Sequence, residues 1–116
     1  MTVLIVDAAN VVGSVPDGWW RDRRGAAERL RDRLAERTGD EEIVLVVEGA
    51  ARGVQSVPGV RVDSAPGSGD DRIVELAAEY AATGDCVVVT ADRALRERVQ
   101  AHGARCTGPR TVRPAD

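Results

Sequence analysis

The chain of 116 residues contains no lysine and no phenylalanine, and it has only one histidine and two cysteines. Without lysine there can be no GxxxxGKS/T phosphate-binding loop. Neither Cys86 nor Cys106 belongs to a CxxC pair, so a zinc site is disfavoured and we expect both thiols to be buried. A single histidine, His102, and the lack of a GxSxG motif leave serine- or cysteine-type hydrolysis without support, and we expect His102 at a helix end.

Long hydrophobic runs are also missing from the sequence. No apolar run approaches the roughly 18 to 20 residues that a membrane-spanning helix needs. The chain enters a strand pattern directly, with no charged leader, so a cytoplasmic protein is expected. The net charge of −3 is not that of an obvious nucleic-acid binder. All 16 basic residues are arginines, however, and arginine is well suited to binding phosphate.

Short apolar runs alternate with helical patterns along the whole chain. The runs predict strands at 3–6, 43–47, 60–62, 86–89 and 104–107. Apolar residues at helical spacing predict helices at 22–37 and 70–82, and another that contains Leu95 and Val99. This alternation predicts an α/β fold, a three-layer α/β/α sandwich with a central parallel sheet. We expect the domain to span 1–108 and a polar C-terminal tail, 109–116, to fray.

Acidic residues follow the predicted strands, at the edge where open parallel sheets place their ligands. They are Asp7, Glu48, Asp70, Asp71 and Asp92, with Asn10 and Thr90 as neutral oxygen donors nearby. Each alone has an ordinary structural explanation as a turn, a strand end or a helix cap. Together they would repel, by roughly 4 kcal/mol for two charges about 4 Å apart at an effective dielectric of 20. Protonation would relieve this repulsion, and so would a hard cation such as Mg²⁺ or Mn²⁺.

Other folds that place acidic residues at strand ends do not fit the sequence. A receiver domain needs an acidic pair after its first strand and a lysine after its last, and the chain has one aspartate there and no lysine. A Toprim domain would account for the VVEGA segment around Glu48, but the DxD step that it needs is missing. The segment 67–69 also fails the GxGxxG pattern of a dinucleotide-binding loop.

Three motifs in chain order resemble the NYN domains of the PIN-like nuclease superfamily, and their bacterial YacP-like branch in particular. The motifs are DAAN (7–10), GSGDD (67–71) and VVVTAD (87–92), and the resemblance spans Val3 to about Cys106. It implies a parallel sheet between helices and an endoribonuclease that uses Mg²⁺ or Mn²⁺ to hydrolyse RNA phosphodiester bonds. It also implies that Asp7, Asp71 and Asp92 are catalytic and hold the metal. The supporting residues would be Asn10, Glu48, Asp70 and Thr90.

Two positions depart from the family pattern. The family usually has glycine after its first aspartate, where this chain has Ala8. Its second strand usually ends in aspartate, where Glu48 carries one more methylene. Both departures bear on activity more than on fold. A catalytically weak or inactive PIN-like module that binds RNA or a protein is therefore the alternative that stays open.

Trp19 and Trp20 are two of only three aromatic residues, and arginines follow them directly. On a loop beside the acidic edge, such residues could stack bases and hold phosphates of single-stranded RNA. The candidate RNA contacts are Trp19, Trp20, Arg21, Arg24, Arg72 and Arg93. Alternatively, the tryptophans cover the core and the loop, and the arginines pair with the carboxylates. The sequence leaves a homodimer open, and nothing in it identifies an antitoxin-like or ribosome-associated partner.

Overall fold

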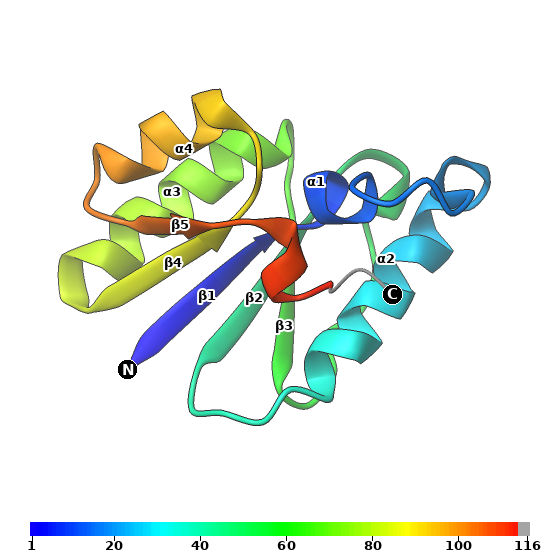
Figure 1. Cartoon of the computed structure of the whole chain (residues 1–116), viewed down its shortest axis with the longest axis horizontal. Coiled ribbons are helices and arrows are strands. Elements are labelled where there is room, and N and C mark those ends of the chain that lie inside the picture. The colour runs from blue at the N-terminus through cyan, green and yellow to red at the C-terminus, as the bar shows by residue number, and fades with distance from the viewer. Residues whose placement is uncertain (114–116) are drawn as a thin grey trace.

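The computed structural model describes residues 1–113, which contain a single five-stranded sheet. Its strands are β1 (Thr2–Asp7), β2 (Glu42–Val47), β3 (Val60–Ser64), β4 (Asp85–Val89) and β5 (Arg105–Thr107). All neighbours are parallel, in the order β3-β2-β1-β4-β5 (Figure 1). β1 and β2 are continuous apolar runs because both faces of the sheet are covered. The predicted strands and the parallel three-layer architecture are thus confirmed.

Helices cover both faces of the sheet (Figure 1). α1 (Ala8–Val12) and α2 (Arg23–Ala35) pack on one face, and α3 (Gly69–Thr83) and α4 (Arg93–Gln100) pack on the other. Because side chains alternate along a strand, Leu4 and Val6 join the first core while Val3 and Ile5 join the second. Within residues 1–113, none of these helices combines the length and apolar character needed to cross a membrane.

The helix α1 differs from the sequence prediction, which placed only a turn and a loop after the first strand. Asp7 caps this helix, because its Oδ1 accepts the N–H of Asn10 at 3.4 Å. Five residues are too few for a helical repeat to be visible in the sequence. The glycine- and tryptophan-rich loop after α1 contains a 3₁₀ turn, η1 (Trp19–Arg21), and a second 3₁₀ turn, η2 (Gly49–Ala51), follows β2.

The segment after β5 also differs from the prediction, because residues 109–113 are packed and not frayed. The 3₁₀ turn η3 (Pro109–Thr111) leads to Val112, which is buried in the core on the α1–α2 side. Arg113 donates to the carbonyl of Val12 at 2.9 Å and pairs with Asp17. One apolar side chain and one arginine therefore attach this segment to the end of α1. The remainder of the expected tail, 114–116, lies outside the described residues.

Candidate active site at the acidic edge of the sheet

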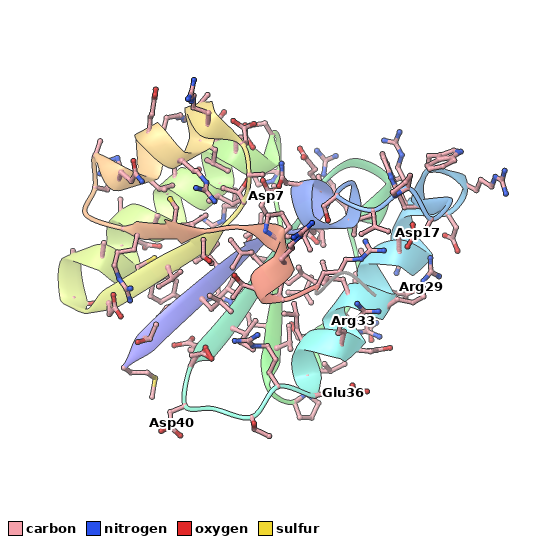
Figure 2. All side chains as sticks on the ribbon, viewed as in Figure 1. Asp7, Asp17, Arg29, Arg33, Glu36 and Asp40 are labelled. Atoms are coloured by element: carbon pink, nitrogen blue, oxygen red, sulfur yellow. The ribbon has the colours of Figure 1, made fainter. Side chains whose placement is uncertain are left out.

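Asp7, the last residue of the central strand, is the most deeply placed carboxylate of the site, with 5% of its surface exposed. Figure 2 shows it where β1 meets α1. Thr90 Oγ1 donates to Asp7 Oδ2 at 2.9 Å. Burial raises the pKa of Asp7 to about 6, and the charges of Asp70 and Glu48 add to the rise, while the hydrogen bonds from Thr90 and Asn10 oppose it.

Hydrogen bonds fix the loop between β4 and α4 against Asp7. Thr90 Oγ1, while donating to Asp7, accepts the N–H of Asp92 at 3.2 Å. Asn10 Oδ1 accepts the N–H of Ala91 at 2.8 Å. Asp92 caps α4, because its Oδ1 accepts the N–H of Leu95 at 3.1 Å. Asn10 and Thr90 thus fix the position of Asp92 relative to Asp7.

Glu48 follows β2 and reaches the start of α3. Its Oε2 accepts the N–H of Gly69 at 2.8 Å. A Cβ at position 69 would lie 3.1 Å from the Glu48 carboxyl carbon, so glycine permits this close approach. The extra methylene of Glu48, relative to the aspartate typical of the family, lets the carboxylate reach this helix terminus.

The neighbouring acids Asp70 and Asp71 point in different directions, since consecutive helical residues are about 100° apart. Asp70 is half-buried, and its pKa is raised by burial and by the charges of Asp92 and Glu48. Asp71 is exposed, and Arg98 donates to its Oδ1 at 2.9 Å. The structure therefore brings Asp70, not Asp71, toward the other carboxylates. The role of metal ligand that the motif implied for Asp71 stays a prediction.

The acidic edge, defined as Asp7, Glu48, Asp70 and Asp92, has the chemistry of a hard-cation site. Carboxylate oxygens are the ligands that Mg²⁺ and Mn²⁺ prefer. The raised pKa values of Asp7 and Asp70 reflect burial and a mutual repulsion that a cation would relieve. As arranged within residues 1–113, no three acidic, histidine or cysteine side chains are close enough together to enclose a metal. The four carboxylates are thus the right type of ligand for such a cation. Their side chains would have to move closer together to bind it.

Two arginines that were predicted to contact RNA are engaged within the fold. Arg24 donates to the carbonyls of Arg52 and Gly53 at 2.9 and 3.1 Å. Arg72 forms two hydrogen bonds of 2.9 Å with Asp63, and these hold the pKa of that carboxyl below its usual value. Both guanidinium groups therefore stabilise the tertiary structure, which leaves them less available to bind phosphate.

Trp20 and two other predicted arginines remain at the surface, whereas Trp19 is half-buried and packs against the core on the α1–α2 side. Trp20 is 50% exposed and meets Trp19 edge to face, with ring centroids 5.8 Å apart. Arg21 lies 6.0 Å from the Trp20 ring centroid, and Arg93 is exposed at the start of α4. Arg23, which also follows the tryptophans in the sequence, lies 5.4 Å from the Trp19 centroid.

A cavity of about 390 Å³ opens beside the acidic edge, between α1, η1, the start of α2 and η2. Trp19 and Arg23 line it together with several small residues from these elements. Glu48 and Ala8, which directly follows Asp7, also belong to its lining. The cavity and the acidic edge therefore share a border.

The thiols and the histidine do not enter this site. Cys86 is buried and Cys106 is half-buried, and burial raises the pKa of Cys86 to about 11. Few thiolates therefore form near neutral pH, and nucleophilic chemistry at Cys86 is disfavoured. His102 is exposed just beyond α4, at the helix end where it was expected.

A parallel sheet between two helical layers, with carboxylates gathered beyond the strand ends, is the architecture of a PIN-like domain. Among solved structures, the chain is similar to crystal structures of Rae1 (YacP) from Bacillus subtilis, with a TM-score of 0.75. At 25% identity, one match covers 95% of this chain and 70% of that one. A tryptophan-to-leucine variant of Rae1 matches at 22% identity, over 97% and 72%.

This structural match confirms the NYN-like, YacP-like resemblance that the three motifs indicated. No protein-family model matches the chain, and no curated protein matches it either. The likeness is therefore clearer in the three-dimensional structure than in the sequence.

Proposed function

We propose that the chain is a metal-dependent endoribonuclease that hydrolyses RNA phosphodiester bonds at the acidic edge. The observation that carries this proposal is the convergence of four carboxylates from separate segments, with the pKa of Asp7 raised to about 6. Perturbed carboxylates gathered at one edge of a fold are typical of catalytic sites. The fold shared with YacP and the order of the three motifs support the same conclusion.

In this proposal, Asp7, Asp70 and Asp92 hold Mg²⁺ or Mn²⁺. When bound, such an ion supplies a water of lowered pKa and stabilises charge on the phosphoryl oxygens. The chain contributes the orientation of the ligands: Thr90 bonds both the Asp7 side chain and the Asp92 backbone. Asp92 caps α4 with Oδ1. Its other carboxyl oxygen makes no hydrogen bond within the described residues.

Glu48 has a different role, because its carboxylate is tied to the N–H of Gly69. It supplies negative charge beside Asp7 and Asp70 and fixes the start of α3. The substrate is single-stranded RNA, since the exposed Trp20 and the neighbouring Arg21 offer base stacking and phosphate binding outside the acidic edge.

A second candidate is a PIN-like module that binds RNA or a protein without cutting. Two observations favour it. Glu48 replaces the aspartate typical of the family, and the carboxylates of residues 1–113 do not enclose a metal site as arranged. Under this reading, the acidic edge lowers its charge by taking up protons, as the raised pKa of Asp7 permits.

Cleavage of a mixed-sequence single-stranded RNA separates the two candidates. The protein, in excess over RNA, is incubated with Mg²⁺, with Mn²⁺ and with EDTA. We expect internal cleavage with either ion and none in EDTA, and we expect Asp7→Asn, purified identically, to remove the activity and so exclude a contaminating nuclease. RNA binding without cleavage under every metal condition would favour the binding module.

A further inference from the structure

We propose that the cavity beside the acidic edge binds one unpaired nucleobase of the RNA strand that crosses that edge. The identity of the strand rests on the proposed function, whereas occupation of the cavity by a base does not require cleavage. The inference assigns Trp19 and Arg23 to substrate binding.

The position of the cavity links it to the acidic edge. Ala8, which directly follows Asp7, belongs to the cavity wall, and Glu48 belongs to both the wall and the acidic edge. A base in the cavity would therefore place its own ribose and phosphates next to the carboxylates. The cavity would select the nucleotide that flanks the scissile bond.

The shape and lining of the cavity suit a flat, mostly apolar group with a polar rim. Its volume of about 390 Å³ falls within the range of roughly 300 to 1,000 Å³ typical of small-molecule pockets. Small aliphatic side chains, including Ala9 and Ala51, form much of the wall. The half-buried Trp19 ring and the Arg23 guanidinium, 5.4 Å from its centroid, are the groups on which RNA bases stack.

Polar groups at the rim are held in place before any ligand arrives. Arg52 Nε donates to the carbonyl of Ala65 at 2.8 Å, and its terminal nitrogen donates to the carbonyl of Gly67 at 3.2 Å. Glu48 is fixed by the N–H of Gly69. A few polar groups with fixed positions in a largely apolar wall orient a ligand without large ordering costs.

Charge next to the cavity favours a nucleic acid strand over a neutral ligand. Arg23 and Arg52 both belong to the cavity lining, in a chain of net charge −3. Arg29 and Arg33 project from α2 (Figure 2) around a separate hollow, which Asp17 and Arg113 also line. A base that is paired in a duplex cannot enter such a cavity without leaving its partner, so the substrate base must be unpaired or flipped out.

Fluorescence of Trp19 provides a direct test that does not depend on cleavage. In Trp20→Tyr, Trp19 is the only tryptophan. This variant is titrated in EDTA with AMP and with ribose 5-phosphate, which lacks the base, and signals are corrected for nucleotide absorption. We expect saturable quenching by AMP below about 10 mM, the range for a Kd near 1 mM, and no quenching by ribose 5-phosphate.

Filling the cavity provides the matched control. Ala9 is exposed on α1 and lines the cavity, whereas Ala82 is exposed on α3, away from it. In the Trp20→Tyr background, Ala9→Leu should weaken AMP binding at least about tenfold, within the roughly 5- to 150-fold range of a lost base stack, and Ala82→Leu should not. Equal responses to AMP and ribose 5-phosphate, no saturable response to AMP, or equal effects of the two leucine variants would overturn the proposal.

Cleavage assays separate failure of this proposal from failure of the proposed function. If AMP binds in the cavity but RNA is never cut, the base site stands and the nuclease proposal fails. If RNA is cut with Mg²⁺ but the rate is the same when an abasic nucleotide replaces each base in turn, the nuclease stands and the base site fails.

Discussion

The acidic edge and the arginine-rich segment 21–37 meet at the cavity but are built differently. Asp7, Glu48 and Asp92 each accept a hydrogen bond from a backbone N–H, and Asp7 accepts another from the buried hydroxyl of Thr90. Most arginines of the segment are exposed on α2 or in the turn before it. The first region therefore fixes geometry, and the second supplies charge.

This difference predicts different consequences of substitution. Carboxylates at the acidic edge repel one another, so removal of one charge should relieve strain while it removes a ligand. Arg24, Arg31 and Arg37 donate to backbone carbonyls of other segments. Removal of one of the other, solvated arginines of the segment should weaken RNA binding with little effect on folding.

The largest effect is expected for Asp7→Asn, which keeps the shape of the side chain and removes its charge. The cleavage rate should fall at least about 100-fold, because even substitutions that only support metal ligands cost about 10- to 100-fold. Initial rates with Mg²⁺ measure it. Asp40→Asn is the control, since Asp40 is an exposed acid at the opposite end of the molecule (Figure 2). Equal loss in both variants would contradict a local role of Asp7.

The pH dependence of stability should also depend on Asp7. Its folded pKa, about 6, lies above the ordinary aspartate value of 3.8, so between these two pH values the folded state retains a proton that the unfolded state has lost. Its contribution to the free energy of unfolding should therefore fall, by up to about 3 kcal/mol, as pH rises from about 4 to about 6, and stay low above that.

Urea unfolding in EDTA across this pH range measures the effect. Asp7→Asn should show a flatter profile than the wild type and greater stability at pH 7. Asp40→Asn should follow the wild-type curve. If the wild type instead gains stability relative to Asp7→Asn as pH rises, the folded state does not disfavour the charged form of Asp7, and the expectation is wrong.

The adjacent acids of α3 provide the next comparison. Asp70→Asn should lower the cleavage rate by about tenfold or more, because Asp70 faces Glu48 and Asp92. Asp71→Asn should have a smaller effect, since it breaks only an exposed ion pair with Arg98, worth roughly 0.2 to 1 kcal/mol. The Mg²⁺-induced rise in Tm should shrink in the first variant and persist in the second. The reverse order would restore Asp71 as the ligand.

The smallest effect is expected for the salt dependence of RNA binding, which should differ between variants of Arg93 and Arg72. Arg93→Ala should reduce the slope of log Kd against log salt by about one for RNA binding, because Arg93 is exposed beside Asp92. Arg72→Ala should leave the slope unchanged and lower Tm, since it leaves the half-buried Asp63 without its principal partner. Identical slopes for the wild type and both variants would show that neither arginine contacts phosphate.

The sequence was sufficient to predict the sheet, because each buried strand of a parallel sheet is a short, continuous apolar run that can be recognised locally. The strands around Ile5, Val44 and Val88 are each apolar on both faces. The acidic edge could be predicted from the same pattern, because the carboxyl ends of parallel strands lie at one edge of the sheet. The helix α1 was missed, because five residues show no helical repeat.

Other features depended on direction and on contacts between distant segments. The motif GSGDD does not indicate which of its two aspartates faces the other carboxylates. That depends on how the helix α3 is oriented about its axis, because consecutive helical residues point about 100° apart. The cavity combines residues of α1, η1, α2 and η2, so no single stretch of sequence shows it. The packing of Val112 and Arg113 depends on two residues in an otherwise polar segment.

The hydrogen bond between Thr90 and Asp7 joins residues that are 83 positions apart. A fragment that ends before β4 retains the sequence for pairing β1 with β2 and β3, but it has neither Thr90 nor Asp92. Closing so long a loop is slow and costly in entropy, so the site is completed late in folding. A partly synthesised or truncated chain would therefore carry Asp7 without the partners that orient it. The proposed RNA hydrolysis would begin only once almost the whole domain is in place.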